Sequence, residues 1–215
     1  MENYKKNLEL LTKNYVYSKE MEHDACGVGL IASTEGKKSR AVVEYGVKAL
    51  KAVWHRGAVD ADGKTGDGAG IHLEIPKDFF IEKIQITGHD YDNSEICVGM
   101  IFLPRNDYSS QESCKTIVES ELTKSDFNIY GWRQVPVNPK VLGEKALQTM
   151  PEIIQVLFKS NDQKLLDKEL ERKIYETRKK IENKALNLSL NNFYVCSMSS
   201  KSIIYKGMFL AEAIS

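Results

Sequence analysis

The sequence predicts a layered α+β domain with antiparallel sheets. Predicted strands and helices are both plentiful, but they do not alternate strictly along the chain, as they would in a doubly wound parallel sheet. Several predicted strands follow one another across short turns, and short connections favour antiparallel pairing. The chain has 215 residues, of which 42% are hydrophobic, so it can bury the core of one domain or at most two.

The first quarter of the sequence contains one predicted strand and one predicted helix. Residues 1–25 show only a weak helical pattern. The segment 26–32 is short, apolar and bounded by charge, which indicates a buried strand. A helix is expected to begin at Ser39, because apolar residues recur at helical spacing from Val42 to Trp54.

The rest of the sequence alternates between apolar runs and amphipathic segments. The helical spacing of apolar residues predicts helices at 110–125 and 162–187. Prolines at 76 and 104 end two predicted strands, because proline cannot donate to a strand ladder. In order, the expected strands are 71–75, 96–103, 127–137 and 153–158, followed by a hairpin formed by 191–199 and 202–208.

Charge and composition exclude several classes of protein. Lys plus Arg and Asp plus Glu each number 30, so the chain lacks the basic excess of a nucleic-acid binder. No apolar run approaches the roughly 18 residues that span a membrane, and the polar first 25 residues do not resemble a secretory signal. The four cysteines are scattered, which argues against a zinc site or a disulfide scaffold and favours a reducing cytoplasm.

A glycine-dense stretch, Thr65-Gly-Asp-Gly-Ala-Gly70, leads into the predicted strand 71–75. It is not the dinucleotide fingerprint, because position 71 is isoleucine, and no Gly-Lys-Ser/Thr follows as in a phosphate-binding loop. From the pattern alone, the simplest interpretation is a tight turn that feeds a strand.

Cys26 is the one cysteine whose setting suggests chemistry. A free cysteine is most often a small buried hydrophobe, and the positions of Cys97, Cys114 and Cys196 on apolar faces fit that role. Cys26 instead follows a polar stretch, begins the first predicted strand and precedes a glycine. The residues alone therefore leave open whether Cys26 packs or acts as a nucleophile.

Several motifs, in this order, resemble the start of glutamate synthase large subunits. They are Asp24-Ala-Cys-Gly-Val-Gly-Leu-Ile-Ala32, His55-Arg-Gly-Ala58, the glycine-dense stretch, Gly131-Trp-Arg133 and Tyr205-Lys-Gly-Met208. The resemblance spans residues 20–210 and is weaker in the middle. The first domain of that family is a class II glutamine amidotransferase, an N-terminal nucleophile hydrolase. Two alternatives stay open: another class II amidotransferase, such as an asparagine or glucosamine-phosphate synthase domain, or a non-catalytic fragment.

The resemblance implies a fold and a set of site residues. The fold would be a four-layer αββα sandwich, incomplete at its C-terminus, with 1–25 as a propeptide and 26–215 as a partial amidotransferase domain. The implied catalytic residues are Cys26, whose freed α-amine would serve as the base, and Arg56 in support. The implied substrate-binding residues are Gly27, Thr65, Gly66 and Asp67.

The resemblance also implies partners and cofactors. L-glutamine would be the substrate, and downstream synthase domains would use the ammonia to make glutamate from 2-oxoglutarate. FMN and a 3Fe-4S cluster are implied for the full-length enzyme, with none held in this segment, and a small NADPH-oxidising flavoprotein subunit is a further implied partner. The family's His-Ser-Arg and Asn-Gly motifs do not occur in this sequence, so the substrate-carboxylate arginine and the oxyanion donors are expected beyond Ser215.

Overall fold

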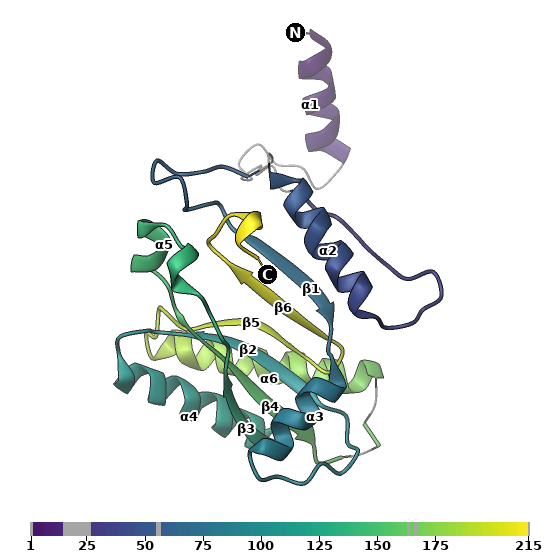
Figure 1. Ribbon diagram of the computed structural model, residues 1–215, viewed down its shortest axis with the longest axis vertical. Coiled ribbons are helices and arrows are strands. Elements are labelled where there is room, and N and C mark those ends of the chain that lie inside the picture. The colour runs from purple at the N-terminus through teal and green to yellow at the C-terminus, as the bar shows by residue number, and fades with distance from the viewer. Residues whose placement is uncertain (1, 15–26, 55–56, 163, 166, 215) are drawn as a thin grey trace.

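The computed structural model describes residues 2–14, 27–54, 57–162, 164–165 and 167–214. Within these ranges the strands form two antiparallel sheets (Figure 1). The larger sheet has the order β3-β4-β2-β5, and the smaller one pairs β1 with β6. The strands are β1 Ala69–Glu74, β2 Cys97–Leu103, β3 Phe127–Gln134, β4 Glu152–Ser160, β5 Tyr194–Ser199 and β6 Ser202–Gly207.

Helices cover the sheets and connect them. Helices α4 and α6 pack together on one face of the four-stranded sheet, while α2 contacts β1 of the two-stranded sheet (Figure 1). The helices are α1 Glu2–Asn14, α2 Arg40–Ala52, α3 Lys77–Ile86, α4 Tyr108–Lys124, α5 Glu144–Gln148 and α6 Asp167–Asn187, with short 3-10 turns at Pro139–Val141 and Ala211–Ala213.

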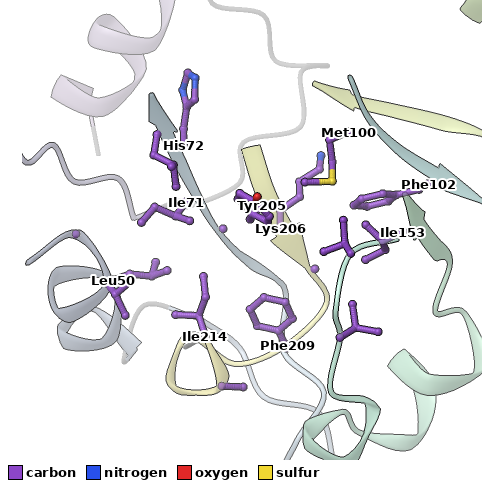
Figure 2. A pocket seen from close by; sticks show the side chains of 18 of the residues that line it. Leu50, Ile71, His72, Met100, Phe102, Ile153, Tyr205, Lys206, Phe209 and Ile214 are labelled. Carbon is purple, nitrogen blue, oxygen red and sulfur yellow. The ribbon is translucent and has the colours of Figure 1, made fainter. Parts of the chain in front are cut away.

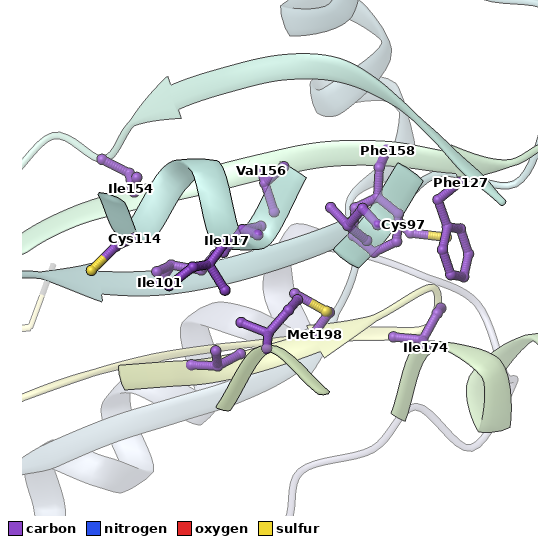
Figure 3. Close-up of a cluster of buried hydrophobic side chains, with 14 of the residues drawn as sticks. Cys97, Ile101, Cys114, Ile117, Phe127, Ile154, Val156, Phe158, Ile174 and Met198 are labelled. Carbon is purple, nitrogen blue, oxygen red and sulfur yellow. The ribbon is translucent and has the colours of Figure 1, made fainter. Parts of the chain in front are cut away.

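Two hydrophobic cores lie on the two faces of the four-stranded sheet. Strand β2 supplies both cores: Cys97 and Ile101 face α4 and α6, while Val98 and Met100 face the two-stranded sheet. Figure 3 shows the helix-side core, where Phe158 of β4 meets Phe127 of β3 edge to face, with ring centroids 5.2 Å apart. A strand buried on both faces has a continuous apolar run, and the run at 96–103 predicts this strand for that reason.

The predicted α+β class is confirmed, and every strand pair is antiparallel. The helix expected at Ser39 is also confirmed, because the Ser39 side chain caps α2 by accepting the N–H of Val42 at 3.4 Å. The layers run from α4 and α6 through the four-stranded sheet to the two-stranded sheet, with α2 against β1. This order agrees with the expected sandwich.

The predicted strand at 26–32 is wrong for the part that the structure describes. Residues 27–32 contain no strand, and the side chains of Val28 and Leu30 are 93% and 89% exposed. An apolar run indicates that a segment can be buried, but a strand also needs a partner for its backbone hydrogen bonds. Within the described ranges, β1 pairs with β6 and no strand pairs with 27–32.

The predicted hairpin of 191–199 and 202–208 is also wrong, although both strands exist. β5 pairs with β2 in the large sheet, and β6 pairs with β1 in the small one, placing Ile203 opposite Leu73. The chain changes sheet at Ser200 and Lys201, where the Glu171 carboxylate of α6 holds the corner. It accepts hydrogen bonds from the Ser199 hydroxyl at 2.9 Å and from the Ser200 N–H and hydroxyl, each at 2.7 Å.

Removing this carboxylate is expected to destabilise the fold. We expect Glu171→Ala to lower the free energy of unfolding by about 2–3 kcal/mol, because Ser200 is buried and would lose its acceptor. Urea denaturation measures the change. Glu169→Ala, at an exposed position on the same helix, is the matched control. Equal stability of the two variants would show that the corner does not depend on Glu171.

Candidate functional site

Of the predicted site residues, Cys26 and Arg56 lie outside the described residues, whereas the four predicted substrate-binding residues lie inside them. Gly27 is exposed at the beginning of the unpaired segment 27–32. Thr65 and Gly66 are buried and Asp67 is exposed, and all three precede β1. The structure therefore brings Thr65, Gly66 and Asp67 into one loop and leaves Gly27 in a different segment.

A large open cavity of about 2370 Å³ lies between α2, the two-stranded sheet and the four-stranded sheet. Figure 2 shows mainly apolar side chains around it, from α2 (Leu50), β1 (Ile71), β2 (Met100, Phe102), β4 (Ile153) and the C-terminal segment (Phe209, Ile214). The cavity is larger than a common pocket for a small molecule, which measures about 300–1,000 Å³. The lining includes Gly27 but none of Thr65, Gly66 and Asp67, so this cavity does not unite the predicted substrate-binding residues.

The loop 58–67 closes on itself through backbone pairing. The Ala58 N–H donates to the Asp67 carboxylate at 2.9 Å, and the Asp67 N–H donates to the Ala58 carbonyl at 3.3 Å. Val59 and Gly66 form an antiparallel bridge between these contacts, and the Asp60 N–H donates to the Thr65 carbonyl at 2.9 Å. The turn at the tip uses Gly63 at φ +69°, a conformation that favours glycine.

The Asp62 carboxylate organises the tip of this loop. One oxygen accepts the N–H groups of Lys64 and Thr65 at 2.9 and 2.7 Å, and the other accepts the Thr65 hydroxyl at 2.6 Å. These hydrogen bonds, led by the Thr65 hydroxyl, hold the pKa of Asp62 well below its usual range, so the carboxylate stays ionised at neutral pH. The Thr65 hydroxyl therefore donates its hydrogen bond to Asp62 within the protein, so its proton is not available for a hydrogen bond to a ligand.

Helix α5 and Gly143, the residue before it, pack against the loop 58–67. Lys145 donates to Asp60 at 2.5 Å, and this contact lowers the pKa of Asp60 and raises that of Lys145. A Cβ atom at Gly143 would overlap the Thr65 hydroxyl and the Asp62 carboxylate, so only glycine fits there. The loop is therefore anchored to a segment about eighty residues further along the chain.

The three described cysteines have the environment of packing residues, as predicted. Cys97 and Cys114 are 0% exposed and Cys196 is 4% exposed, and all three are free thiols. Burial raises the pKa of each thiol, to about 11 for Cys114, because a thiolate is poorly solvated in the core. Thiolates are the reactive form, so these side chains are poor nucleophiles at neutral pH.

The reactivity of the three buried cysteine thiols can be measured directly. In native protein at pH 8, we expect Cys97, Cys114 and Cys196 to resist a small alkylating reagent, and all to react once urea unfolds the chain. Peptide mass spectrometry assigns each modified thiol. Rapid native modification of any of the three would contradict the described core.

No group of three or more His, Cys, Asp or Glu side chains in the described ranges is arranged to hold a metal ion. In the same part of the chain, no helix has the length and apolar character needed to cross a membrane.

Comparison with known proteins assigns the class. The model of the family "Glutamine amidotransferases class-II" matches residues 26–215, and the chain belongs to that family. It is 50% identical over 212 residues to the glutamate synthase (NADPH) large chain of Azospirillum brasilense, covering 99% of this chain and 14% of that protein. It is 40% identical over 195 residues to ferredoxin-dependent glutamate synthase 1 of Arabidopsis thaliana, covering 90% of this chain and 12% of that protein. The chain thus spans only a small part of the length of these relatives.

Sequence reasoning missed the residues that fix the loop. Asp62 and Gly63 form an Asp-Gly pair, a turn signal that could have pointed to a carboxylate-capped tip. Gly143 and Lys145 carry no comparable signal, because their role depends on a tertiary contact with Asp60, Asp62 and Thr65.

Proposed function

We propose that this chain is the glutamine-hydrolysing part of a glutamate synthase and that Cys26 is its nucleophile. The observation that carries the proposal is the family match, which begins at Cys26 itself and continues to residue 215. The similarity to glutamate synthases from a bacterium and a plant supports the assignment within the family. In this proposal residues 1–25 are a propeptide, and residues 26–215 belong to the amidotransferase domain.

The proposed chemistry uses two groups of one residue. Cleavage before Cys26 frees an α-amine, whose reference pKa of about 7.7–8.0 lies just below the thiol value of about 8.5. The amine takes the thiol proton, and the thiolate attacks the side-chain amide of glutamine. The carbon–nitrogen bond then breaks, the amine returns the proton, and ammonia leaves. Water hydrolyses the remaining γ-glutamyl thioester to glutamate and regenerates the thiol.

The described residues support this assignment of the nucleophile. The other three cysteines are buried and have raised thiol pKa values, which makes them unsuitable. Gly27, the residue after the proposed nucleophile, is exposed and presents no side chain to an approaching substrate. Arg56 would support the thiolate electrostatically, and the loop of Thr65, Gly66 and Asp67 would form part of the substrate site.

The remaining partners follow from the same proposal. Ammonia would pass to synthase domains that convert 2-oxoglutarate to glutamate, with FMN and a 3Fe-4S cluster supplying electrons there. The described cysteines do not fit the iron–sulfur cluster, which is held by several thiolates close together, because Cys97, Cys114 and Cys196 are dispersed through the two cores. A small NADPH-oxidising flavoprotein subunit would be a further partner. The free thiols support a cytoplasmic location, where cysteines stay reduced.

Acceptor specificity tests the proposed function. In the protein as its own gene encodes it, we expect glutamine to support glutamate formation from 2-oxoglutarate in the presence of a reductant. Transfer to aspartate or to fructose 6-phosphate would instead identify another class II amidotransferase. Absence of any ammonia release from glutamine would indicate a non-catalytic protein.

A further inference from the structure

Residues 76–200 leave the two-stranded sheet and return to it at a single point. Strand β1 ends at Glu74, which lies directly opposite Ser202, the first residue of β6. One residue further out, the Ile75 N–H donates to the Lys201 carbonyl at 3.0 Å. The chain therefore departs and re-enters between two hydrogen-bonded neighbours. A domain can be inserted into another one without disturbing it when the two ends of the insert lie close together in this way.

The segment between these two points contains a complete unit of sheet and helices. All four strands of the larger sheet belong to it, in the chain order β2-α4-β3-β4-α6-β5. Neighbouring strands are antiparallel, and α4 and α6 cover the same face (Figure 1). This βαββαβ arrangement is a recurrent motif that covers its sheet with its own helices. Every member of the helix-side core lies between Cys97 and Met198, so this core is built without β1, β6 or α2.

The rest of the described chain meets this unit mainly through side chains. Within the described residues, the two sheets share no strand ladder. In the core between the sheets, Ile75 and Ile203 are the buried members that lie outside 76–200. Hydrogen bonds across the junction use side chains, as where the Ile204 N–H donates to the Ser197 hydroxyl at 3.2 Å. Contacts of this kind also join separate domains of one chain, which move relative to each other more readily than the strands of one sheet.

We propose that residues 76–200 form an accessory unit inserted between β1 and β6, which opens independently of these strands and contributes no residue that touches glutamine. This inference rests on the proposed function. The proposed catalytic residues Cys26 and Arg56 and the loop 58–67 all precede the insert in the sequence. The glutamine site is then built from the chain on either side of the insert, which the pairing of β1 with β6 brings together.

Hydrogen exchange of the backbone amides, in the protein as its own gene encodes it, tests independent opening. Ile174→Ala removes a fully buried side chain of the helix-side core. We expect it to speed exchange in β2, β4 and β5 by about 30-fold or more, while exchange in β1 and β6 stays within about twofold. Tyr175→Ala, at an exposed position beside Ile174, is the matched control and should change neither sheet.

Gly70→Ala tests the converse. A Cβ at Gly70 would lie 2.8 Å from the Tyr205 carbonyl oxygen, so this substitution disturbs the pairing of β1 with β6. We expect it to speed exchange in β1 and β6 and to leave β2, β4 and β5 within about twofold of wild type.

Kinetics tests the second half of the inference. In Ile174→Ala, the KM for glutamine and the glutamine-dependent rate should stay within about twofold of wild type, because Ile174 supports only the insert. A tenfold rise in the KM for glutamine at an unchanged ammonia-dependent rate would overturn this part, since it would show that the insert shapes the glutamine site.

Faster exchange throughout both sheets in Ile174→Ala would overturn the independence of the insert, because that result describes one cooperative unit. If Ile174→Ala does not fold, Ile174→Val decides the question, with an expected increase of about threefold to tenfold confined to β2, β4 and β5. A wild-type protein that forms glutamate from ammonia but not from glutamine would refute the proposed function and leave the exchange result standing.

Discussion

Replacing Cys26 with alanine is expected to reduce glutamine-dependent activity by about 10⁴-fold or more, while activity with free ammonia is retained. The proposed mechanism assigns all of the amide chemistry to the Cys26 thiolate, and no other described cysteine can substitute for it, because all three are buried. The synthase reaction consumes ammonia and does not need the thiol. Steady-state assays with glutamine and with ammonium salts measure the two activities in the same preparation.

Cys196→Ala is the matched control for this substitution. Cys196 is 4% exposed and packs between the two sheets, so its loss should cost some stability and leave the glutamine-dependent rate within about twofold. A Cys26→Ala protein that hydrolyses glutamine at the wild-type rate would show that the nucleophile lies elsewhere.

Replacing Phe158 with alanine is expected to lower the free energy of unfolding by about 3–5 kcal/mol, the usual cost of deleting a fully buried aromatic ring. Phe158 is 0% exposed and stacks edge to face on Phe127 in the core beneath α4 and α6 (Figure 3). A small protein is commonly stable by only about 5–15 kcal/mol, so the variant should approach the unfolding threshold. Thermal and urea denaturation both report the change.

Tyr108→Ala provides the comparison for an aromatic side chain at the surface. Tyr108 is 79% exposed at the first position of α4, and its removal should change stability by no more than about 0.5 kcal/mol. Similar losses for Phe158→Ala and Tyr108→Ala would contradict the assignment of the helix-side core.

Local patterns in the sequence predicted the elements that depend mainly on local contacts. Ser39 and the apolar residues after it predicted α2, and the inward stripe of Cys114, Ile117 and Leu122 predicted α4. The continuous apolar run 96–103 predicted the strand β2, which the structure shows to be buried on both faces. In each case the periodicity of the side chains and the burial that it requires point to the same element.

Pairing between distant segments could not be predicted in this way. The two-residue connection at Ser200 and Lys201 suggested a hairpin. In the structure β6 pairs with β1 instead, and the Glu171 carboxylate stabilises the connection between the two sheets. The apolar run predicts a buried strand at 26–32, but in its described part, 27–32, Val28 and Leu30 are exposed. Helices α3 and α5 were not predicted, because α5 is very short and α3 is apolar on more than one side.

At the candidate site, too, local patterns were informative, whereas tertiary contacts could not be predicted. The sequence pointed to the glycine-dense stretch and, through family resemblance, to Thr65, Gly66 and Asp67. It gave no indication that Thr65 would be buried, since that depends on Gly143 packing against the loop. The cavity likewise brings together side chains from segments far apart in the sequence, such as Leu50 and Ile153.

In the proposed mechanism, Cys26 becomes the N-terminal residue and attacks glutamine. Peptide mass spectrometry of active protein treated with an electrophilic glutamine analogue tests this role most directly. The proposed mechanism predicts an N-terminal peptide that begins at Cys26 and carries the label, with Cys97, Cys114 and Cys196 unlabelled. Fully active protein that retains Met1, or equal labelling of all four cysteines, would contradict it.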